Sequence, residues 1–212
     1  MPFVLPRLYT IVDSSLVPHS PSSDRVAEIA GFANELAEGG AKIIQYRNKS
    51  DNPAATLAEA QEIKRRLSGK QATLIMNDRA DLCVGAQFDG VHLGQEDISV
   101  NGARKVCPHA LLVGISTHNA QQVREADKTS ADYIAFGPVF GTSSKENPDP
   151  AVGIDGVRAA RALTRKPLVA IGGITRENCR DVVAAGADSV AVISDLLREP
   201  RIACRRFIQL LS

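Results

Sequence analysis

The chain has 212 residues, a hydrophobic fraction of 44%, a charged fraction of 23% and a formal net charge of +1. It is long enough for one sizeable core and short for two ordinary domains, and its near-neutral charge argues against a global attraction to nucleic acid or membranes. With no Trp and few other aromatic residues it also lacks platforms for base stacking, so we expect no nucleic-acid partner.

The cysteines and the apolar segments point to an intracellular setting. The four cysteines are scattered and form no CxxC pair, which argues against a zinc site or a redox dithiol and favours reduced, buried thiols. No apolar run approaches the roughly 20 residues that span a bilayer, and the first residues lack the basic start of a signal peptide. We therefore expect a cytoplasmic protein with no membrane partner.

Strand-like and helix-like segments alternate along the chain, which is the pattern of a parallel α/β fold. The expected strands are short, apolar on both faces and often β-branched, as strands covered on both sides should be. They are predicted at residues 8–12, 43–47, 73–77, 90–93, 111–116, 133–136, 168–171 and 189–192.

Helical periodicity fills the segments between the strands. Ser23 is a candidate cap for the first helix, Pro53 suits the first turn of the second, and Asn119 should begin a later one. Residues 202–211 are predicted to form a closing helix. The first helix carries one apolar stripe at helical spacing, formed by Val26, Ile29, Ala30, Ala33 and Ala37.

This alternation predicts an α/β protein of one domain, a (β/α)8 TIM barrel over residues 1–212. Related tripeptides precede every second strand, ending at Lys42, Asp89, Asp132 and Asp188, as a fourfold repeat would show. The main rival is a doubly wound open sheet, which usually carries a glycine-rich loop after its first strand, and residues 12–14 contain no glycine. The long irregular segment 137–153 is predicted to be functional, as a mobile lid.

Carboxylates follow two neighbouring predicted strands. The third strand ends in Asn77 and Asp78, and the fourth runs into a loop that ends in Asp97. Parallel strands deliver their carboxyl ends to one rim, and Mg²⁺ prefers one or two protein carboxylates together with substrate phosphate oxygens. The alternative is that the two aspartates cap the helices that follow, near Ala80 and Val100.

Two anion sites are indicated at the same rim. The glycine pair 172–173 lets a phosphate approach the backbone, and Ser194 lies where a helix begins, in loops that often hold phosphate in barrels. Arg47, Lys49 and Lys145, with a metal ion, exceed what one monoester needs and suit a diphosphate. The alternative is that Arg47 and Lys49 merely solvate a loop.

Other polar residues give weaker indications. His92 lies within a predicted strand, where a satisfied core histidine is a better interpretation than a catalytic base. No Ser, Cys or Lys has a recognisable activating base beside it in sequence, so covalent catalysis is not indicated.

Six segments of the chain resemble the thiamine-phosphate synthase family, in order and at suitable spacing over residues 8–197. They are QYRNK at 45–49, MND at 76–78, HLGQED at 92–97, GPVFGTSSK at 137–145, AIGGI at 170–174 and VISDL at 192–196. The resemblance implies a TIM-barrel transferase of thiamine biosynthesis. Such enzymes join 4-amino-2-methyl-5-hydroxymethylpyrimidine diphosphate to a (carboxy)thiazole phosphate, giving thiamine phosphate and diphosphate through a cation-like, dissociative substitution.

The resemblance also implies roles for individual residues. Asp78 and Asp97 would hold Mg²⁺, and catalysis would rest on Arg47, Lys49, Lys145 and Ser116. The pyrimidine diphosphate would contact Gln45, Arg47, Lys49, Asn77, Ser116 and Lys145. The thiazole phosphate would contact Thr142, Ser143, Ser144, Gly173, Ile193 and Ser194. The expected partners are these small molecules, and assembly into a homo-oligomer is left open. A thiazole tautomerase of the sister family is the alternative, although it would have no use for the metal carboxylates and the diphosphate-binding cations together.

Overall fold

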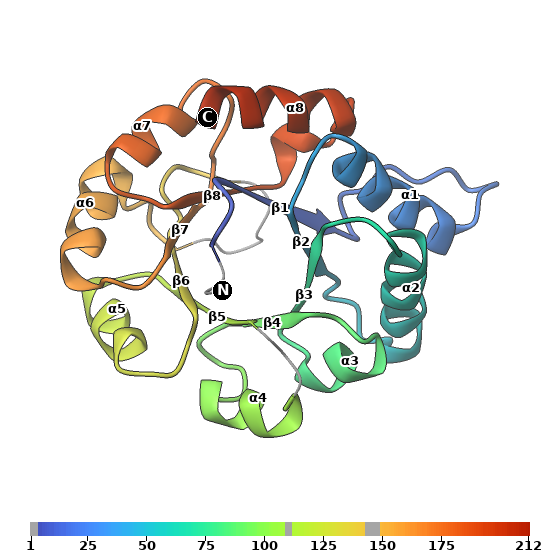
Figure 1. Ribbon diagram of the computed structural model, residues 1–212, viewed down its shortest axis with the longest axis horizontal. Coiled ribbons are helices and arrows are strands. Elements are labelled where there is room, and N and C mark those ends of the chain that lie inside the picture. The colour runs from blue at the N-terminus through green and yellow to red at the C-terminus, as the bar shows by residue number, and fades with distance from the viewer. Residues whose placement is uncertain (1–3, 109–111, 143–148) are drawn as a thin grey trace.

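The structure is a computed structural model that describes residues 4–108, 112–142 and 149–212. In this part of the chain eight parallel strands close into a barrel in the order β1 to β8, and helices surround the barrel (Figure 1). The strands are β1 Leu8–Asp13, β2 Ile43–Arg47, β3 Thr73–Asn77, β4 Gly90–Leu93, β5 Leu112–Thr117, β6 Tyr133–Phe136, β7 Leu168–Ile171 and β8 Ser189–Val192. The predicted (β/α)8 barrel is confirmed.

Helices connect successive strands and cover the outer face of the barrel (Figure 1). They are α1 Arg25–Glu38, α2 Pro53–Arg66, α3 Ala80–Gly85, α4 Val100–Val106, α5 Ala120–Asp127, α6 Gly153–Leu163, α7 Cys179–Ala184, the short 3₁₀ helix η1 Ser194–Leu196, and α8 Pro200–Leu211.

The predicted element boundaries agree closely with the structure. The strand bounds are confirmed for β2, β3, β4, β6, β7 and β8, whereas β1 and β5 each end one residue later than predicted, at Asp13 and Thr117. Pro53 occupies the first turn of α2, and Asn119 caps α5 by accepting from the Gln122 backbone N–H. The prediction that Ser23 caps α1 is wrong by one residue. Asp24 accepts from the Val26 backbone N–H, and the Ser23 hydroxyl donates to the Ser20 carbonyl.

The core has two layers because successive side chains of a strand point to opposite faces. One layer lies between the strands and the helices and includes Val12, Ile44 and Met76. The other fills the barrel interior, with Tyr9, Ile11, Ile43, Ile75, Leu112, Tyr133, Ala135, Val169 and Ala191. Alternate residues continue this interior face toward the carboxyl ends of the strands, where polar side chains replace apolar ones.

The four cysteines are free thiols and buried, as expected from their scatter along the chain. Among the described residues, no helix combines the length and the apolar composition that crossing a bilayer requires.

Candidate active site

Asp78 and Asp97 meet at the carboxyl-terminal rim of the barrel. Asp78 directly follows β3 in the left-handed region, with φ of 60°, and its backbone N–H donates to the His92 carbonyl at 2.7 Å. Asp97 follows β4, and its carboxylate accepts from the Gly94 backbone N–H at 2.6 Å. Burial, together with contact with the Asp78 carboxyl group, raises the pKa of Asp97 above its ordinary value. The predicted convergence of the two carboxyl groups is confirmed.

The capping alternative for these aspartates is wrong. Arg79 occupies the N-cap position of α3 without a side-chain capping bond, and Ser99 caps α4 by accepting from the Gly102 backbone N–H at 3.1 Å. Neither carboxylate of the pair satisfies a helix end. A left-handed backbone at Asp78 is a conformation that costs free energy outside glycine, and such residues cluster at functional sites.

Two cations from the end of β2 reach carboxylates at this rim. Arg47 pairs with Asp13, which lies directly opposite it in the β1–β2 register, and its side chain is 21% exposed. Lys49 pairs with Asp78 and is 59% exposed. The alternative that these cations only solvate a loop is therefore wrong for Arg47, which is held against a buried carboxylate.

A buried carboxylate beneath the rim anchors the loops that follow β1 and β2. Glu59 of α2 is 5% exposed, and its carboxylate accepts hydrogen bonds from Ser14 at 3.0 Å, from Asn48 at 3.2 Å and from the Tyr46 hydroxyl. Asn48 lies between Arg47 and Lys49, so this contact holds the segment that presents both cations.

Replacing Glu59 by alanine is expected to lower the free energy of unfolding by roughly 3 kcal/mol, because three donors lose their buried acceptor. Urea-induced unfolding measures this change. Glu62→Ala on the same helix is the matched control, since Glu62 makes surface ion pairs with Arg65 and Arg66. Equal losses for the two variants would contradict the anchoring role of Glu59.

Polar side chains from neighbouring strands form the floor of the candidate site. The Gln45 amide N–H donates to the Asn77 Oδ1 at 2.7 Å, and both residues are buried. Ser116 is half-buried, and its hydroxyl lies 2.8 Å from His92 Nε2. The other ring nitrogen of His92 lies 3.1 Å from the Tyr133 hydroxyl. The interpretation of His92 as a satisfied core histidine is confirmed.

Stability should depend on pH through His92, because burial lowers its pKa to about 4. Between about pH 4 and 6.5 the unfolded chain binds a proton at this residue and the folded chain does not, so folding stability falls as pH decreases through this window. We expect His92→Gln to remove up to about 3 kcal/mol of this pH dependence. Urea unfolding at a series of pH values tests it. An unchanged slope in the variant would show that other groups carry the dependence.

The loops after β6, β7 and β8 contact one another on the other side of the rim. Gly172 and Gly173 have φ of 101° and 63°, and a Cβ atom on Gly173 would lie 2.5 Å from the Gly141 carbonyl oxygen. Arg176 pairs with Asp195 of η1 at 2.8 Å, which joins the loops after β7 and β8. The structure thus brings Gly173 close to the segment that precedes Thr142.

Three residues predicted for the thiazole and diphosphate sites, Ser143, Ser144 and Lys145, lie outside the described residues. Of their predicted partners, Thr142 and Ile193 are half-buried and Ser194 is exposed at the start of η1. The ends of the 137–153 segment are tied together, because the backbone N–H of Val152 donates to the Pro138 carbonyl at 2.9 Å. The lid role of this segment stays a prediction.

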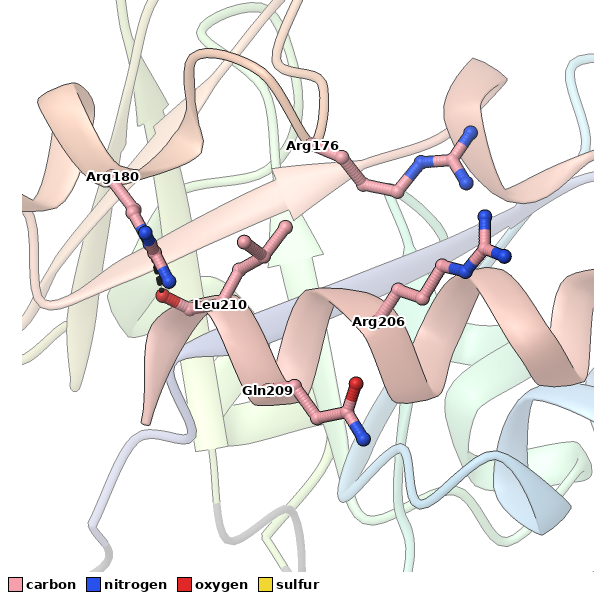
Figure 2. Close-up of a pocket in the computed structure, with 5 residues that line it drawn as sticks. All are labelled: Arg176, Arg180, Arg206, Gln209 and Leu210. Carbon is pink, nitrogen blue, oxygen red and sulfur yellow. Dashed lines mark hydrogen bonds between the residues drawn. The ribbon is translucent and has the colours of Figure 1, made fainter.

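A pocket of about 440 Å³ lies on the outside of the barrel between α7 and α8, lined by Arg176, Arg180, Arg206, Gln209 and Leu210 (Figure 2). Arg176 is already paired with Asp195, and Arg180 donates to the Leu210 carbonyl at 3.0 Å. This pocket is separate from the rim that carries the carboxylate pair.

Comparison with known proteins identifies the family. The profile described as thiamine monophosphate synthase matches residues 8–196. The chain belongs to the thiamine monophosphate synthase family. It is 55% identical over 207 residues to thiamine-phosphate synthase of Koribacter versatilis, which covers 98% of this chain and 96% of the relative. The Methanospirillum hungatei thiamine-phosphate synthase is 41% identical over 206 residues, with 96% and 97% covered.

A solved relative has the same fold. Thiamine phosphate pyrophosphorylase from Pyrococcus furiosus superposes with a TM-score of 0.83 at 30% identity, covering 97% of this chain and 95% of that structure. The protein is thus a transferase of the thiamine monophosphate synthase family. Three features of this family member were missed from sequence: the Asp13 partner of Arg47, the Glu59 anchor and the buried tyrosines beside Gln45 and His92. The only indication for Asp13 was its place at the carboxyl end of the first strand.

The carboxylate pair of this family member suits a hard divalent cation bound jointly with a substrate. Among the described residues, no group of three or more His, Cys, Asp or Glu side chains could hold a metal by itself. The two carboxyl groups are in contact, and burial and the Asp78 carboxyl group raise the pKa of Asp97. Among the described residues, the ion pair at these carboxyl groups joins Lys49 to Asp78. Mg²⁺ bound through one or two carboxylates and substrate phosphates fits that donor set.

Proposed function

We propose that the protein joins 4-amino-2-methyl-5-hydroxymethylpyrimidine diphosphate to a (carboxy)thiazole phosphate and releases thiamine phosphate and diphosphate, together with carbon dioxide when the thiazole carries the carboxylate. The observation that carries this proposal is the meeting of Asp78 and Asp97 at the rim that also presents Arg47 and Lys49. Paired carboxylates that can hold a metal ion, beside cations, suit a diphosphate, with its two phosphates and larger charge, better than a single phosphate monoester. Membership of the thiamine monophosphate synthase family supports the same assignment.

The pyrimidine diphosphate is assigned to the β2–β5 side of the rim. Gln45, Asn77 and Ser116 would contact the ring, because they form the polar floor beneath the rim. The diphosphate would lie above them, against cations of the loops. Its contacts are Arg47, Lys49 and, by resemblance, Lys145.

The thiazole phosphate is assigned to the β6–β8 side. Gly173, in the left-handed region, lies in the loop after β7, and Ser194 is exposed in the loop after β8; these are the two loops that most often hold phosphate in barrels. The proposed contacts are Thr142, Ser143, Ser144, Gly173, Ile193 and Ser194.

Asp78 and Asp97 are the proposed ligands of Mg²⁺. When bound, the ion would supply positive charge to the oxygens of the departing diphosphate. Lys49 contacts Asp78 in the structure, so substrate binding would let Lys49 exchange this carboxylate for a phosphate oxygen.

The residues of the rim suit a dissociative reaction. The bond between the pyrimidine methylene carbon and the diphosphate oxygen breaks, its electron pair leaves with the diphosphate, and the thiazole nitrogen then forms the new carbon–nitrogen bond. Arg47, Lys49 and Lys145 would stabilise the charge on the leaving group, and Ser116 would hold the cationic ring. No strong general base is needed, which agrees with a neutral, buried His92.

Incubation of the protein with both substrates and Mg²⁺ tests the assignment. We expect thiamine phosphate and diphosphate in equal amounts, and no product when Mg²⁺ is removed with a chelator. Isomerisation of the carboxythiazole phosphate without ring joining would instead support the thiazole tautomerase alternative. Release of diphosphate without thiamine phosphate would contradict the proposed role of the thiazole site.

A further inference from the structure

A continuous chain of hydrogen bonds crosses the barrel interior below the candidate site, and it links side chains of six neighbouring strands. The Gln45 amide N–H donates to Asn77 Oδ1 at 2.7 Å, and Gln45 Oε1 accepts from the Tyr9 hydroxyl at 2.8 Å. The Tyr9 and Tyr133 hydroxyls are 2.7 Å apart. His92 completes the chain, with Nδ1 3.1 Å from the Tyr133 hydroxyl and Nε2 2.8 Å from the Ser116 hydroxyl. The interior chain comprises Asn77, Gln45, Tyr9, Tyr133, His92 and Ser116.

With the Gln45 amide oriented so that its Oε1 faces Tyr9 and its N–H faces Asn77, the protons of this chain have one consistent direction. A tyrosine hydroxyl carries a single proton, and Tyr9 uses it on Gln45. Tyr133 must therefore donate to Tyr9, which leaves the Tyr133 oxygen only as an acceptor for His92. His92 Nδ1 then carries the ring proton. In a neutral imidazole the other nitrogen is an acceptor, so the Ser116 hydroxyl donates to Nε2.

The surroundings keep this chain neutral and fixed. Both ring nitrogens of His92 face hydroxyl groups, and the ring stacks on Tyr133 with centroids 5.5 Å apart and an interplanar angle of 18°. Tyr9 and Tyr133 are each 1% exposed, and burial raises the pKa of both phenols. Gly114 leaves the space for the Tyr133 ring, since a Cβ atom there would lie 2.1 Å from a ring carbon.

We propose that Tyr133 and Tyr9 are positioning residues that, through the Nδ1–H tautomer of His92, make Ser116 a hydrogen-bond acceptor toward the substrate ring. This inference rests on the proposed function and deepens it. At the other end of the chain, Asn77 accepts through its oxygen, so its amide N–H groups are the ones left to face the site. The floor thus offers an acceptor at Ser116 and donors at Asn77.

An amino-substituted nitrogen heterocycle matches that polarity. A 4-aminopyrimidine carries an amino donor next to a ring-nitrogen acceptor. Because the Ser116 proton is used on His92, the Ser116 oxygen would accept a hydrogen bond from the amino group. If the amide of Gln45 were turned over, every hydrogen bond of the chain would reverse, His92 would carry its proton on Nε2, and Ser116 would become a donor. The tautomer of His92 therefore reports the direction of the whole chain.

Nitrogen-15 NMR of histidine-labelled, substrate-free protein tests the proposal. The chain has four histidines, and His92→Gln assigns the signal of interest. We expect a neutral Nδ1–H tautomer for the wild-type His92 at neutral pH. Tyr133→Phe removes the acceptor of Nδ1–H, and Tyr9→Phe frees the Tyr133 proton to be donated to Nδ1, so both variants should move the ring proton to Nε2.

Tyr46→Phe is the matched control, because Tyr46 is an equally buried tyrosine whose hydroxyl contacts Glu59 on the helix side of β2. It should leave the His92 tautomer unchanged. Tyr9→Phe is the more discriminating variant, since Tyr9 contacts neither His92 nor Ser116 in the chain and acts only through Tyr133. If one of the two variants does not fold, the wild-type tautomer and the remaining variant still test the proposal independently.

Steady-state kinetics of Tyr9→Phe and Tyr133→Phe test the effect on substrate binding. In both variants the KM for the pyrimidine diphosphate should rise about tenfold, the size of one lost hydrogen bond, while the KM for the thiazole phosphate stays the same. An Nε2–H or doubly protonated His92 in the wild type, a tautomer that neither variant moves, or a moved tautomer with an unchanged KM would overturn the proposal. Absence of thiamine phosphate formation, with the expected tautomers observed, would overturn the proposed function instead.

Discussion

Asp78→Asn is expected to lower kcat/KM for thiamine phosphate formation at least about a hundredfold, corresponding to about 2.7 kcal/mol of transition-state stabilisation. Asparagine tolerates the left-handed backbone of Asp78, where φ is 60°, so the substitution removes charge with little change of conformation. The loss should follow from weaker neutralisation of the departing diphosphate. Initial rates as a function of pyrimidine diphosphate concentration, at saturating thiazole phosphate and over a series of Mg²⁺ concentrations, measure it.

The stability of the same variant separates this role from a structural one. Burial and the Asp78 carboxyl raise the pKa of Asp97, so ionising Asp97 in the folded protein costs free energy at neutral pH. Removing the charge of Asp78 reduces that cost. Thermal unfolding in the presence of a chelator should therefore show no loss of stability, although activity is lost.

Asp81→Asn is the matched control for this prediction. Asp81 lies three positions along the chain, on α3, and pairs with Arg79 at the surface. Its activity and its Mg²⁺ dependence should equal those of the wild type. Near-normal turnover of Asp78→Asn at saturating Mg²⁺ would remove Asp78 from the mechanism.

Strand positions and the convergence of the carboxylates could be predicted because both follow from local patterns. Short β-branched segments such as 168–171 and 189–192 stand between polar helical segments, and their bounds match β7 and β8. The barrel rule then places the residue after each strand at one rim, which is where Asp78 and Asp97 meet.

Contacts between distant strands could not be predicted in the same way. Tyr9 and Tyr133 are 124 positions apart, and each stands in an apolar strand where an aromatic core residue is the simplest interpretation. Their hydrogen bond depends on the closure of the barrel and on the missing side chain at Gly114. The capping alternative for Asp78 failed for a related reason, because propensity alone does not distinguish a cap from an unusual turn at the end of a strand.

Loss of Arg47 is the second substitution for which we expect a large effect, on both stability and activity. Asp13 is 2% exposed, and Arg47 is its ion-pair partner across β1 and β2. Arg47→Gln leaves a buried carboxylate with the Ser15 donors but without a cation, which should lower the free energy of unfolding by about 3 kcal/mol. Arg65→Gln, which removes an exposed ion pair on α2, is the control and should change stability by less than about 0.5 kcal/mol.

A double-mutant cycle with Asp13→Asn separates the two effects of Arg47. When Asp13 is neutral, the double variant has no uncompensated buried charge and should recover most of the stability that Arg47→Gln loses. It should not recover activity, because the guanidinium that we propose binds the diphosphate is still absent, and we expect a loss of about a hundredfold or more in kcat/KM in both Arg47 variants. Urea unfolding and steady-state kinetics on the four proteins complete the cycle. Recovery of activity together with stability would show that Arg47 serves the fold alone, whereas stable and inactive protein places its charge in the reaction.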